Sequence, residues 1–568
     1  MANIPLVYIL GFPHPKSLFL AWKLLKLTAK PAEQKQKQKS IGAKRMRLLQ
    51  STASKLFKSG ITAATRPLCL AGLLSLTLYG AALHSQSLSA GQAAALAQVT
   101  GPVPVTAQSH PFGAADHTLQ PQNMAELGYI EEEFFISGNA NVYDWPERGR
   151  LEVRTPDVPY TTRLLIRRPA DAARFSGNVV VEMLNPSNLF DLNIAWAMSH
   201  TQMLRNGDAW VGITAKPIAV ETLKQFDAQR YAPLSWANPL AATDPMNCEV
   251  SRDTTQTTEN GLIWDIHTQV GIWLRSADSN NPFNYATTDT SPSMVQKLYA
   301  WGYSQTGSFL YTYLNAIHPQ VTKARGESLF DGYLVAVSSG PSPINQCSPR
   351  IARDDPRRPI ENAGVPVIHI MSQSDYLFGI ASRQPDSDSP DDQFRRYEIA
   401  GSGHASPDEL YWGPKPADLL TAGRTVPPLA CNEGPRSRFP NRLAFNAALV
   451  WLDQWARNDI APPHADLIQV VDGQPVLDEH ANVIGGLRSP YVDVPTSTWN
   501  GNSTGESFCR IAGHEIPFSP EKLKTLYPTH NAYANAVSAN VSELISSGFL
   551  LEADGAELIR EAQQANVP

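Results

Sequence analysis

The sequence predicts an α/β fold built on a doubly wound, mostly parallel sheet. Short, largely apolar runs lack the polar alternation of half-exposed strands, which is typical of strands buried on both faces. They span residues 160–167, 178–184, 209–215, 298–303, 331–338, 365–371 and 394–399. Segments with helical character lie between or after them, at residues 194–205, 260–275, 308–317 and 441–458. Such alternation indicates parallel strands joined by crossover helices, with ligands bound at the carboxyl ends of the strands.

Residues 1–97 are predicted to be an N-terminal extension that ends in a signal peptide. An apolar run at 68–83 follows a basic stretch and precedes the small residues Ala95-Leu96-Ala97. The run is shorter than the ~20 residues of a membrane span, so we expect no stable span after cleavage. An N-terminal membrane anchor is the alternative. A start at Met46 would give a more ordinary signal length. The expected location is therefore secreted or periplasmic.

The remaining residues, 98–568, are predicted to form one α/β domain with two additions. Residues 217–259 are irregular and rich in Pro, Asn and Thr, which indicates either a lid-like insertion or a plain surface loop. From about residue 467 the pattern changes to short mixed strands and then, at 519–565, to helical character. We expect this C-terminal extension, about 467–568, to pack on the main domain and to carry no chemistry of its own.

Charge and cysteine content narrow the functional class. The net charge of −6 and the absence of a basic patch argue against nucleic acid as a partner. One of the five cysteines lies in the predicted signal peptide, and the other four permit two disulfides in three connectivities (Cys248, Cys347, Cys431, Cys509). We favour a Cys347–Cys431 bridge, because both residues follow site-bearing regions. No zinc-ligand spacing occurs, so we predict neither a metal nor another cofactor.

A candidate nucleophile is Ser304. The apolar run 298–303 leads into Gly302-Tyr303-Ser304-Gln305-Thr306-Gly307, and a helix-compatible segment follows and stops at Pro319. A strand, a sharp turn and a helix lift a serine hydroxyl out of the backbone, and small flanking residues are needed because the turn is tight. The alternative is an ordinary loop.

A serine hydroxyl needs a base, and the base needs an orienting carboxylate, in the chain order Ser, Asp or Glu, His for this kind of sheet. Asp375 follows the run 365–371, and His404 follows 394–399 in a glycine-rich turn. Both therefore stand at strand ends in the required order. His369 lies within a strand and is predicted to be a core residue. The competing acids precede a strand, lie within one or lie in a polar loop (Asp354, Asp355, Asp386, Asp388, Asp391, Asp392, Glu398).

Acyl transfer also needs donors for an oxyanion. The first is expected to be the backbone N–H of Gln305, directly after the nucleophile. The second should come from the loop after 178–184, which reads Asn185-Pro186-Ser187-Asn188. Pro186 has no N–H, so the donor is Asn185 or a residue beyond Pro186, such as Ser187.

These segments together resemble the bacterial "alpha/beta hydrolase domain" family of serine hydrolases. The resemblance rests on colinear stretches at residues 126–133, 160–163, 168–171, 179–185, 230–231, 302–307, 399–405 and 485–495. It implies an α/β-hydrolase fold, Ser304 as nucleophile and His404 as base, with Asp375 following by position. Thr306 departs from the serine common in the family, and the loop after Asn185 is poorer in glycine, which affects the expected shape of the acyl pocket.

The sequence thus predicts a serine hydrolase that cleaves carboxylic esters, either small molecules or polymers, through an acyl-enzyme. An amidase or peptidase with the same residues is one alternative, and a non-catalytic extracellular binding protein is another. Several tryptophans near the site elements in sequence are candidates to line an apolar pocket, although core packing is expected for most of them (Trp196, Trp236, Trp264, Trp301, Trp412). The sequence carries no signal for oligomeric state.

Overall fold

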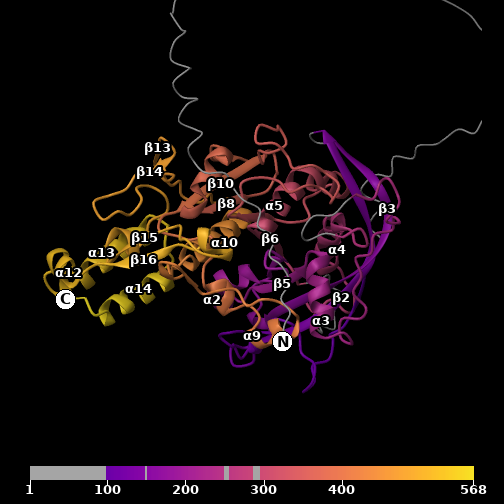
Figure 1. Cartoon of the computed structure of the whole chain (residues 1–568), viewed down its shortest axis with the longest axis horizontal. Coiled ribbons are helices and arrows are strands. Elements are labelled where there is room, and N and C mark those ends of the chain that lie inside the picture. The colour runs from indigo at the N-terminus through magenta and orange to yellow at the C-terminus, as the bar shows by residue number, and fades with distance from the viewer. Residues whose placement is uncertain (1–96, 148–149, 249–254, 286–293, 568) are drawn as a thin grey trace, which may run out of the picture. The chain divides into compact units, whose positions relative to one another are not determined.

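The computed structural model describes residues 97–147, 150–248, 255–285 and 294–567 (Figure 1). The predicted signal peptide and the possible start at Met46 lie outside the described residues. Among the helices in the described ranges, none is long and apolar enough to cross a membrane.

A ten-stranded sheet organises the described chain, in the order β1-β2-β3-β5-β4-β6-β7-β8-β10-β9. The consecutive pairs from β5 to β10 are parallel, and β1, β2, β3 and β9 pair antiparallel at the two sides. This confirms the mostly parallel sheet. The strands are β1 (Gln98–Thr100), β2 (Tyr129–Glu147), β3 (Arg150–Pro169), β4 (Asn178–Leu184), β5 (Ala209–Thr214), β6 (Lys297–Tyr303), β7 (Gly332–Ala336), β8 (Val367–Ser372), β9 (Ser387–Ser389) and β10 (Asp392–Ile399).

The central strands are buried along their whole length, as their apolar runs require. Every residue of β4, β5, β7 and β8 is buried. The long strand β2, whose pairing with β3 extends well beyond the core in Figure 1, is not among the predicted strands. Acidic residues interrupt its apolar pattern, yet Glu133 is buried because Arg163 and Arg230 each donate to its carboxylate at 2.5 Å. Ion pairing of this kind leaves no periodic apolar signal.

Helices flank the sheet. α2 and α10 pack on each other and on central strands, whereas α4 contacts β2 and α5 contacts β6 and β7. Trp264 of α4 meets Phe309 of α5 edge to face. The helices are α2 (Ile194–Asn206), α3 (Pro217–Phe226), α4 (Ile263–Leu274), α5 (Gln305–Thr312), the π-helical turn η4 (Tyr313–Ile317), α6 (His318–Arg325), α7 (Tyr376–Gly379), α8 (Asp408–Tyr411), α9 (Pro416–Thr421), α10 (Arg442–Asn458), α11 (Pro490–Asp493), α12 (Pro520–Leu526), α13 (His530–Ser546) and α14 (Glu552–Gln564).

Two helical predictions need correction, and proline is the reason in both. Helical structure after Ser304 does not stop at Pro319: the π-helical turn η4 leads into α6, and Pro319 lies in the first turn of α6, where its missing N–H has no partner to lose. The stretch 217–259 is not irregular throughout. Pro217 begins α3 in the same way, and the following described residues, 227–248 and 255–259, form turns and isolated bridges.

The C-terminal extension contains two short antiparallel strand pairs and the last helices. Its small strands are β13 (Val470–Val471), β14 (Gln474–Pro475), β15 (Ser497–Asn500) and β16 (His514–Pro517), and β11 (Ala430–Cys431) pairs with β12 (Gly434–Pro435) just before α10. α13 and α14 pack on each other around a separate apolar cluster that includes Leu443 of α10. Asp554 of α14 accepts hydrogen bonds from Arg205 and Asn446, so the extension is joined to α2 and α10.

Candidate active site

The turn that carries Ser304 has the geometry of a strained elbow. Ser304 lies between β6 and α5 with φ of 56°, in the left-handed region. A Cβ on Gly302 would lie 2.2 Å from the carbonyl oxygen of Thr306, and one on Gly307 would lie 2.6 Å from that of Ala336. Both positions therefore require glycine, which is the sequence pattern that marked the turn.

Thr306 strengthens this turn. Its side chain is fully buried, and its hydroxyl accepts from the N–H of Tyr303 at 3.1 Å and lies 3.2 Å from the Tyr303 carbonyl, to which it donates. The departure from serine therefore adds a buried methyl group and keeps the hydrogen bonds of the hydroxyl.

The fold brings Ser304, Asp375 and His404 together from the carboxyl ends of β6, β8 and β10. The Nε2 of His404 lies 2.8 Å from the Ser304 hydroxyl, and its Nδ1 lies 2.9 Å from Oδ1 of Asp375. In the sequence, Ser304 lies 100 positions before His404, and Asp375 lies 29 positions before it. The geometry is that of a nucleophile, a base and an orienting acid.

Asp375 is held by the end of its own strand. Ser372 donates to Oδ2 of Asp375 from its hydroxyl at 2.5 Å and from its N–H at 3.3 Å. Oδ2 of Asp375 thus accepts from Ser372, and Oδ1 faces His404. Asp375 is 5% exposed, so its orientation is set by protein donors rather than by water.

Electrostatics raise the basicity of the histidine. Burial would lower the pKa of the His404 imidazole, but the charge and hydrogen bond of Asp375, with a contribution from Glu409, outweigh it and raise that pKa above its ordinary value. Glu409 is buried on α8, where Arg436 donates to it at 3.1 Å. Burial raises the pKa of Glu409 to about 7, although Arg436 and His404 oppose the rise. Sequence reasoning missed Glu409, whose only signal is its position five residues after His404.

The expected oxyanion donors differ in whether their N–H groups are already hydrogen-bonded. Gln305 is the first residue of α5, so its N–H has no partner within the helix. In contrast, the N–H of Asn185 donates to the carbonyl of Leu192 at 2.9 Å, and that of Ser187 donates to Oδ1 of Asn185 at 2.8 Å. Both backbone groups nominated in this loop are therefore already engaged. The side chain of Asn185 donates to the Tyr303 carbonyl at 2.7 Å and ties the loop to the elbow.

A cavity of about 670 Å³ opens at Ser304. Its walls come from the loops after β4, β6, β7, β8 and β10 and from the C-terminal extension: Pro186, Ser187, Leu189, Ser304, Gln305, Ser308, Val337, Ser338, Ser339, Arg350, Met371, Asp375, His404, Phe508 and Ile511. A second hollow of about 580 Å³ shares Gln305, Ser308, Ser339 and Arg350 with it. The two hollows therefore adjoin along the first turn of α5.

Strained backbone gathers around this cavity. Three of its lining residues are not glycine but have positive φ: Leu189 at 68°, Ser304 at 56° and Val337 at 44°. A β-branched residue such as valine is rarely found there. Strain of this kind persists only where the surrounding structure enforces it, and it is common at functional sites.

Of the tryptophans considered from sequence, Trp264 lines the second hollow. Trp196, Trp236 and Trp301 are buried in the core, as expected. Trp412 packs edge to face on His200. His369 is also a core residue: it is fully buried in β8, and its Nε2 lies 2.8 Å from the Ser338 carbonyl. Among the residues that the structure describes, no group of three or more His, Cys, Asp or Glu is placed to hold a metal ion.

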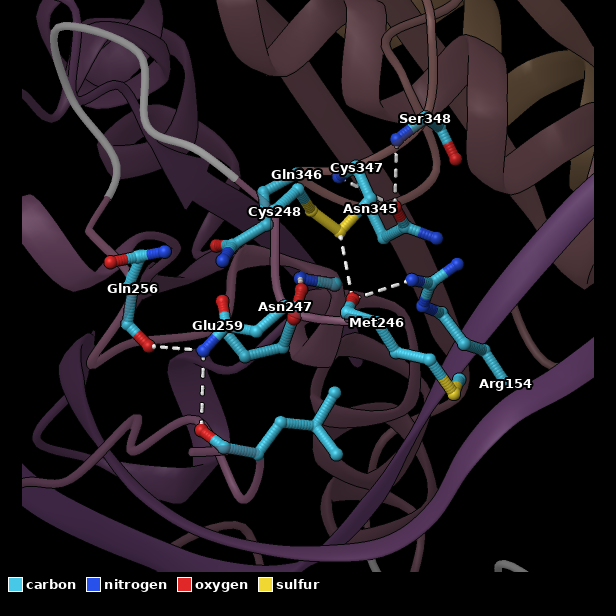
Figure 2. The surroundings of a disulfide bond; sticks show 12 residues. Arg154, Met246, Asn247, Cys248, Gln256, Glu259, Asn345, Gln346, Cys347 and Ser348 are labelled. Atoms are coloured by element: carbon cyan, nitrogen blue, oxygen red, sulfur yellow. Dashed lines mark hydrogen bonds between the residues drawn. A yellow bond between two sulfur atoms is a disulfide. The ribbon is translucent and has the colours of Figure 1, made fainter. Parts of the chain in front are cut away.

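The disulfides are Cys248–Cys347 and Cys431–Cys509, so the predicted Cys347–Cys431 bridge is wrong. The Cα atoms are 5.5 and 5.6 Å apart, within the range of a disulfide, and each bridge joins segments that sequence order keeps apart. Figure 2 shows Cys248 of the inserted stretch bonded to Cys347, whose neighbours Gln346 and Ser348 line the second hollow. Two disulfides are compatible with an extracellular or periplasmic protein.

The alpha/beta hydrolase domain family matches residues 99–560. The chain belongs to this family. Membership confirms the fold expected from the sequence and supports hydrolase activity.

The similarities to individual proteins are distant. No curated protein matches the chain. Solved structures that it resembles include an arylesterase (10% identity, 46% of this chain and 79% of that one, TM-score 0.24) and a fungal esterase from Rhizomucor miehei (10%, 56% and 90%, 0.26). A hyperthermophilic esterase from the archaeon Pyrobaculum calidifontis is similar over 48% of this chain and 77% of its own, at 10% identity and a TM-score of 0.21. At these scores the similarities carry no information about substrate.

Proposed function

We propose that the protein is a serine hydrolase that cleaves carboxylic esters through an acyl-enzyme. The observation that carries the proposal is the 2.8 Å contact between the Ser304 hydroxyl and Nε2 of His404, with Asp375 on the other ring nitrogen. A serine hydroxyl at this distance from a neutral imidazole is activated as a nucleophile.

In the proposed reaction, His404 removes the Ser304 proton as the hydroxyl oxygen attacks the ester carbonyl carbon. Asp375 holds the tautomer that keeps Nε2 unprotonated and then stabilises the imidazolium. His404 next returns the proton to the leaving alkoxide, and the acyl group stays on Ser304. Water repeats the same steps, and the carboxylic acid leaves.

The tetrahedral intermediate needs two donors. We assign the first to the N–H of Gln305. Because the N–H of Ser187 is engaged with Asn185, we assign the second to the hydroxyl of Ser187, which lines the same cavity as Ser304. A hydroxyl donor in this role is consistent with oxyanion holes that use serine side chains.

The location and the inserted stretch belong to the same proposal. We infer that the mature chain is secreted or periplasmic after signal cleavage, which the two disulfides support. We infer further that part of the stretch 217–259 acts as a lid, because Asn260 and the Cys248–Cys347 bridge place its end beside the second hollow.

Ser304→Ala tests the proposal. The purified variant should fold like the wild type, with an unchanged melting temperature, and should lose p-nitrophenyl butyrate turnover and labelling by a fluorophosphonate probe. Wild-type-like turnover in the variant would end the proposal. A matched pair of p-nitrophenyl ester and p-nitroanilide substrates then separates an esterase from an amidase. A folded wild-type protein that neither turns over esters nor takes the probe would instead be a binding protein.

A further inference from the structure

A short segment of the C-terminal extension, the 3₁₀ turn η7 (Ser507–Ile511), lies against the candidate site. Phe508 and Ile511 line the cavity that holds Ser304, although they are about 200 positions further along the chain. The extension therefore contributes side chains to the walls of this cavity.

The backbone of this segment binds both loops that carry the acid and the base. The carbonyl of Ile511 accepts a hydrogen bond from the N–H of Ala405 at 2.9 Å, directly after His404. It also accepts from the hydroxyl of Ser374 at 3.3 Å, directly before Asp375. One carbonyl oxygen thus connects the loops after β8 and β10.

Ser374 extends this connection to the reacting groups. Its side chain is 1% exposed, and its hydroxyl accepts from the N–H of His404 at 2.8 Å. The same oxygen lies 3.0 Å from the hydroxyl of Ser372, which donates to Asp375. Hydrogen bonds therefore run from the Ile511 carbonyl through Ser374 to the backbone of His404, and the Ser374 hydroxyl lies beside Ser372, the residue that holds Asp375.

The segment is fastened on both sides. Cys509 forms the disulfide with Cys431, which anchors η7 to the hairpin of β11 and β12. The carbonyl of Ala512 packs so closely on Gly403 that a Cβ there would lie 2.2 Å from it. Gly403 of the histidine turn is thus required by contact with the extension, and not only by the turn itself.

We propose that this segment completes the active site: Ser374, fixed by the Ile511 carbonyl, is a positioning residue for the His404–Asp375 pair, and Phe508 determines specificity by packing on the apolar part of the ester. The inference rests on the proposed function. The Cys431–Cys509 disulfide holds the segment in place, so the geometry of the His404–Asp375 pair depends on a bridge between the extension and the hairpin of β11 and β12.

The positioning role is tested with Ser374→Ala. Loss of the hydroxyl frees the N–H of His404, so we expect kcat to fall about tenfold or more while KM stays within about twofold. Because a loosened His404 loses part of its contact with Asp375, the acid limb of the pH profile of kcat/KM should move to lower pH. A merely structural role would lower the melting temperature and leave that limb in place, which would overturn the assignment.

The two disulfides give a matched comparison that does not depend on Ser374. The double variant Cys431→Ser/Cys509→Ser should also move the acid limb of the pH profile of kcat/KM to lower pH, and it should lower kcat. Cys248→Ser/Cys347→Ser removes a bridge that has no contact with η7 and should leave the limb where it is. If both double variants behave alike, the proposed coupling through Cys509 is wrong.

Phe508→Ala tests specificity with p-nitrophenyl hexanoate and acetate. The ratio of kcat/KM for hexanoate to that for acetate should fall about tenfold, because apolar contact with the longer chain is lost. A rise in this ratio would also contradict the packing role, because it would mean that Phe508 obstructs the longer chain. Phe518→Ala, in the same extension but at a separate hollow, should not change the ratio. A ratio within about twofold of wild type in Phe508→Ala overturns its role.

Failure of this inference is distinguishable from failure of the proposed function. If wild-type protein shows neither ester turnover nor probe labelling at Ser304, the proposed function is wrong whatever the variants do. If the wild type is active and the variants keep its pH profile and its chain-length ratio, only the role of the segment is wrong.

Discussion

Replacing Asp375 by asparagine tests the acid of the proposed triad with almost no change in shape. Ser372 donates to one oxygen of Asp375 from both its hydroxyl and its N–H. An asparagine would therefore turn its carbonyl oxygen toward Ser372, and its NH₂ would face Nδ1 of His404. The imidazole would have to accept there, which moves its own proton to Nε2. A protonated Nε2 cannot take the Ser304 proton.

The size of the loss follows from this tautomer. Without a base the hydroxyl is not activated, and a wrong histidine tautomer in such a triad lowers kcat by about 10⁴-fold, or roughly 5 kcal/mol of transition-state stabilisation. KM for p-nitrophenyl butyrate should change little, because Asp375 lies behind His404. The free energy of unfolding should also change by no more than about 1 kcal/mol, since both hydrogen bonds to Ser372 persist.

The assay is steady-state hydrolysis of p-nitrophenyl butyrate, with the rate of fluorophosphonate labelling as a second readout of Ser304 reactivity. Glu409→Gln is the matched control, because Glu409 is the other carboxylate that influences His404. It should lose less than about tenfold in kcat, since no hydrogen bond joins it to the imidazole among the described contacts. Asp375→Asn with more than about a tenth of the wild-type kcat would refute the assignment and move it to Glu409.

The other predictions concern the elbow, the oxyanion and pH. Ser187→Ala should lower kcat by about 10²-fold with little change in KM, as for loss of one oxyanion donor, and an unchanged kcat would remove Ser187 from that role. In the wild type, kcat/KM should rise with pH through an apparent pKa above the ordinary value for histidine, because only neutral His404 is a base and its pKa is raised. Glu409→Gln should move that rise to lower pH by removing one of the charges responsible, and a rise that stays in place contradicts this. Gly302→Ala should destabilise the protein by about 3 kcal/mol in chemical denaturation, because the new Cβ would overlap the Thr306 carbonyl; near-wild-type stability would mean that the elbow can open.

Several features of the fold and site could be predicted from the sequence because they depend on local chemistry. Strands buried on both faces need unbroken apolar runs, and β4, β5, β6, β7, β8 and β10 were all predicted for that reason. The elbow around Ser304 needs glycine where Cβ atoms would meet the backbone, so its pattern is visible in six residues. Asp375 and His404 could be chosen because strand ends in a parallel sheet share one edge.

Other features depended on partners that local sequence does not name. The strand β2 is stabilised at Glu133 by arginines from β3 and from the inserted stretch, which no periodicity encodes. Glu409 influences His404 only because α8 folds back beside it. The loop after β4 is another case. The side-chain oxygen of Asn185 accepts the N–H of Ser187, which the sequence had predicted to be free as an oxyanion donor.

The sequence by itself determined the sheet, the elbow and the order of the three site residues, since each follows from burial, backbone geometry or chain order. Tertiary structure alone decided the disulfide pairing, because four cysteines allow three pairings and only distance between Cα atoms selects one. It also decided the walls of the cavity: Phe508 and Ile511 reach Ser304 through the folding of the extension onto the histidine turn, and contacts between segments so far apart leave no pattern in either of them.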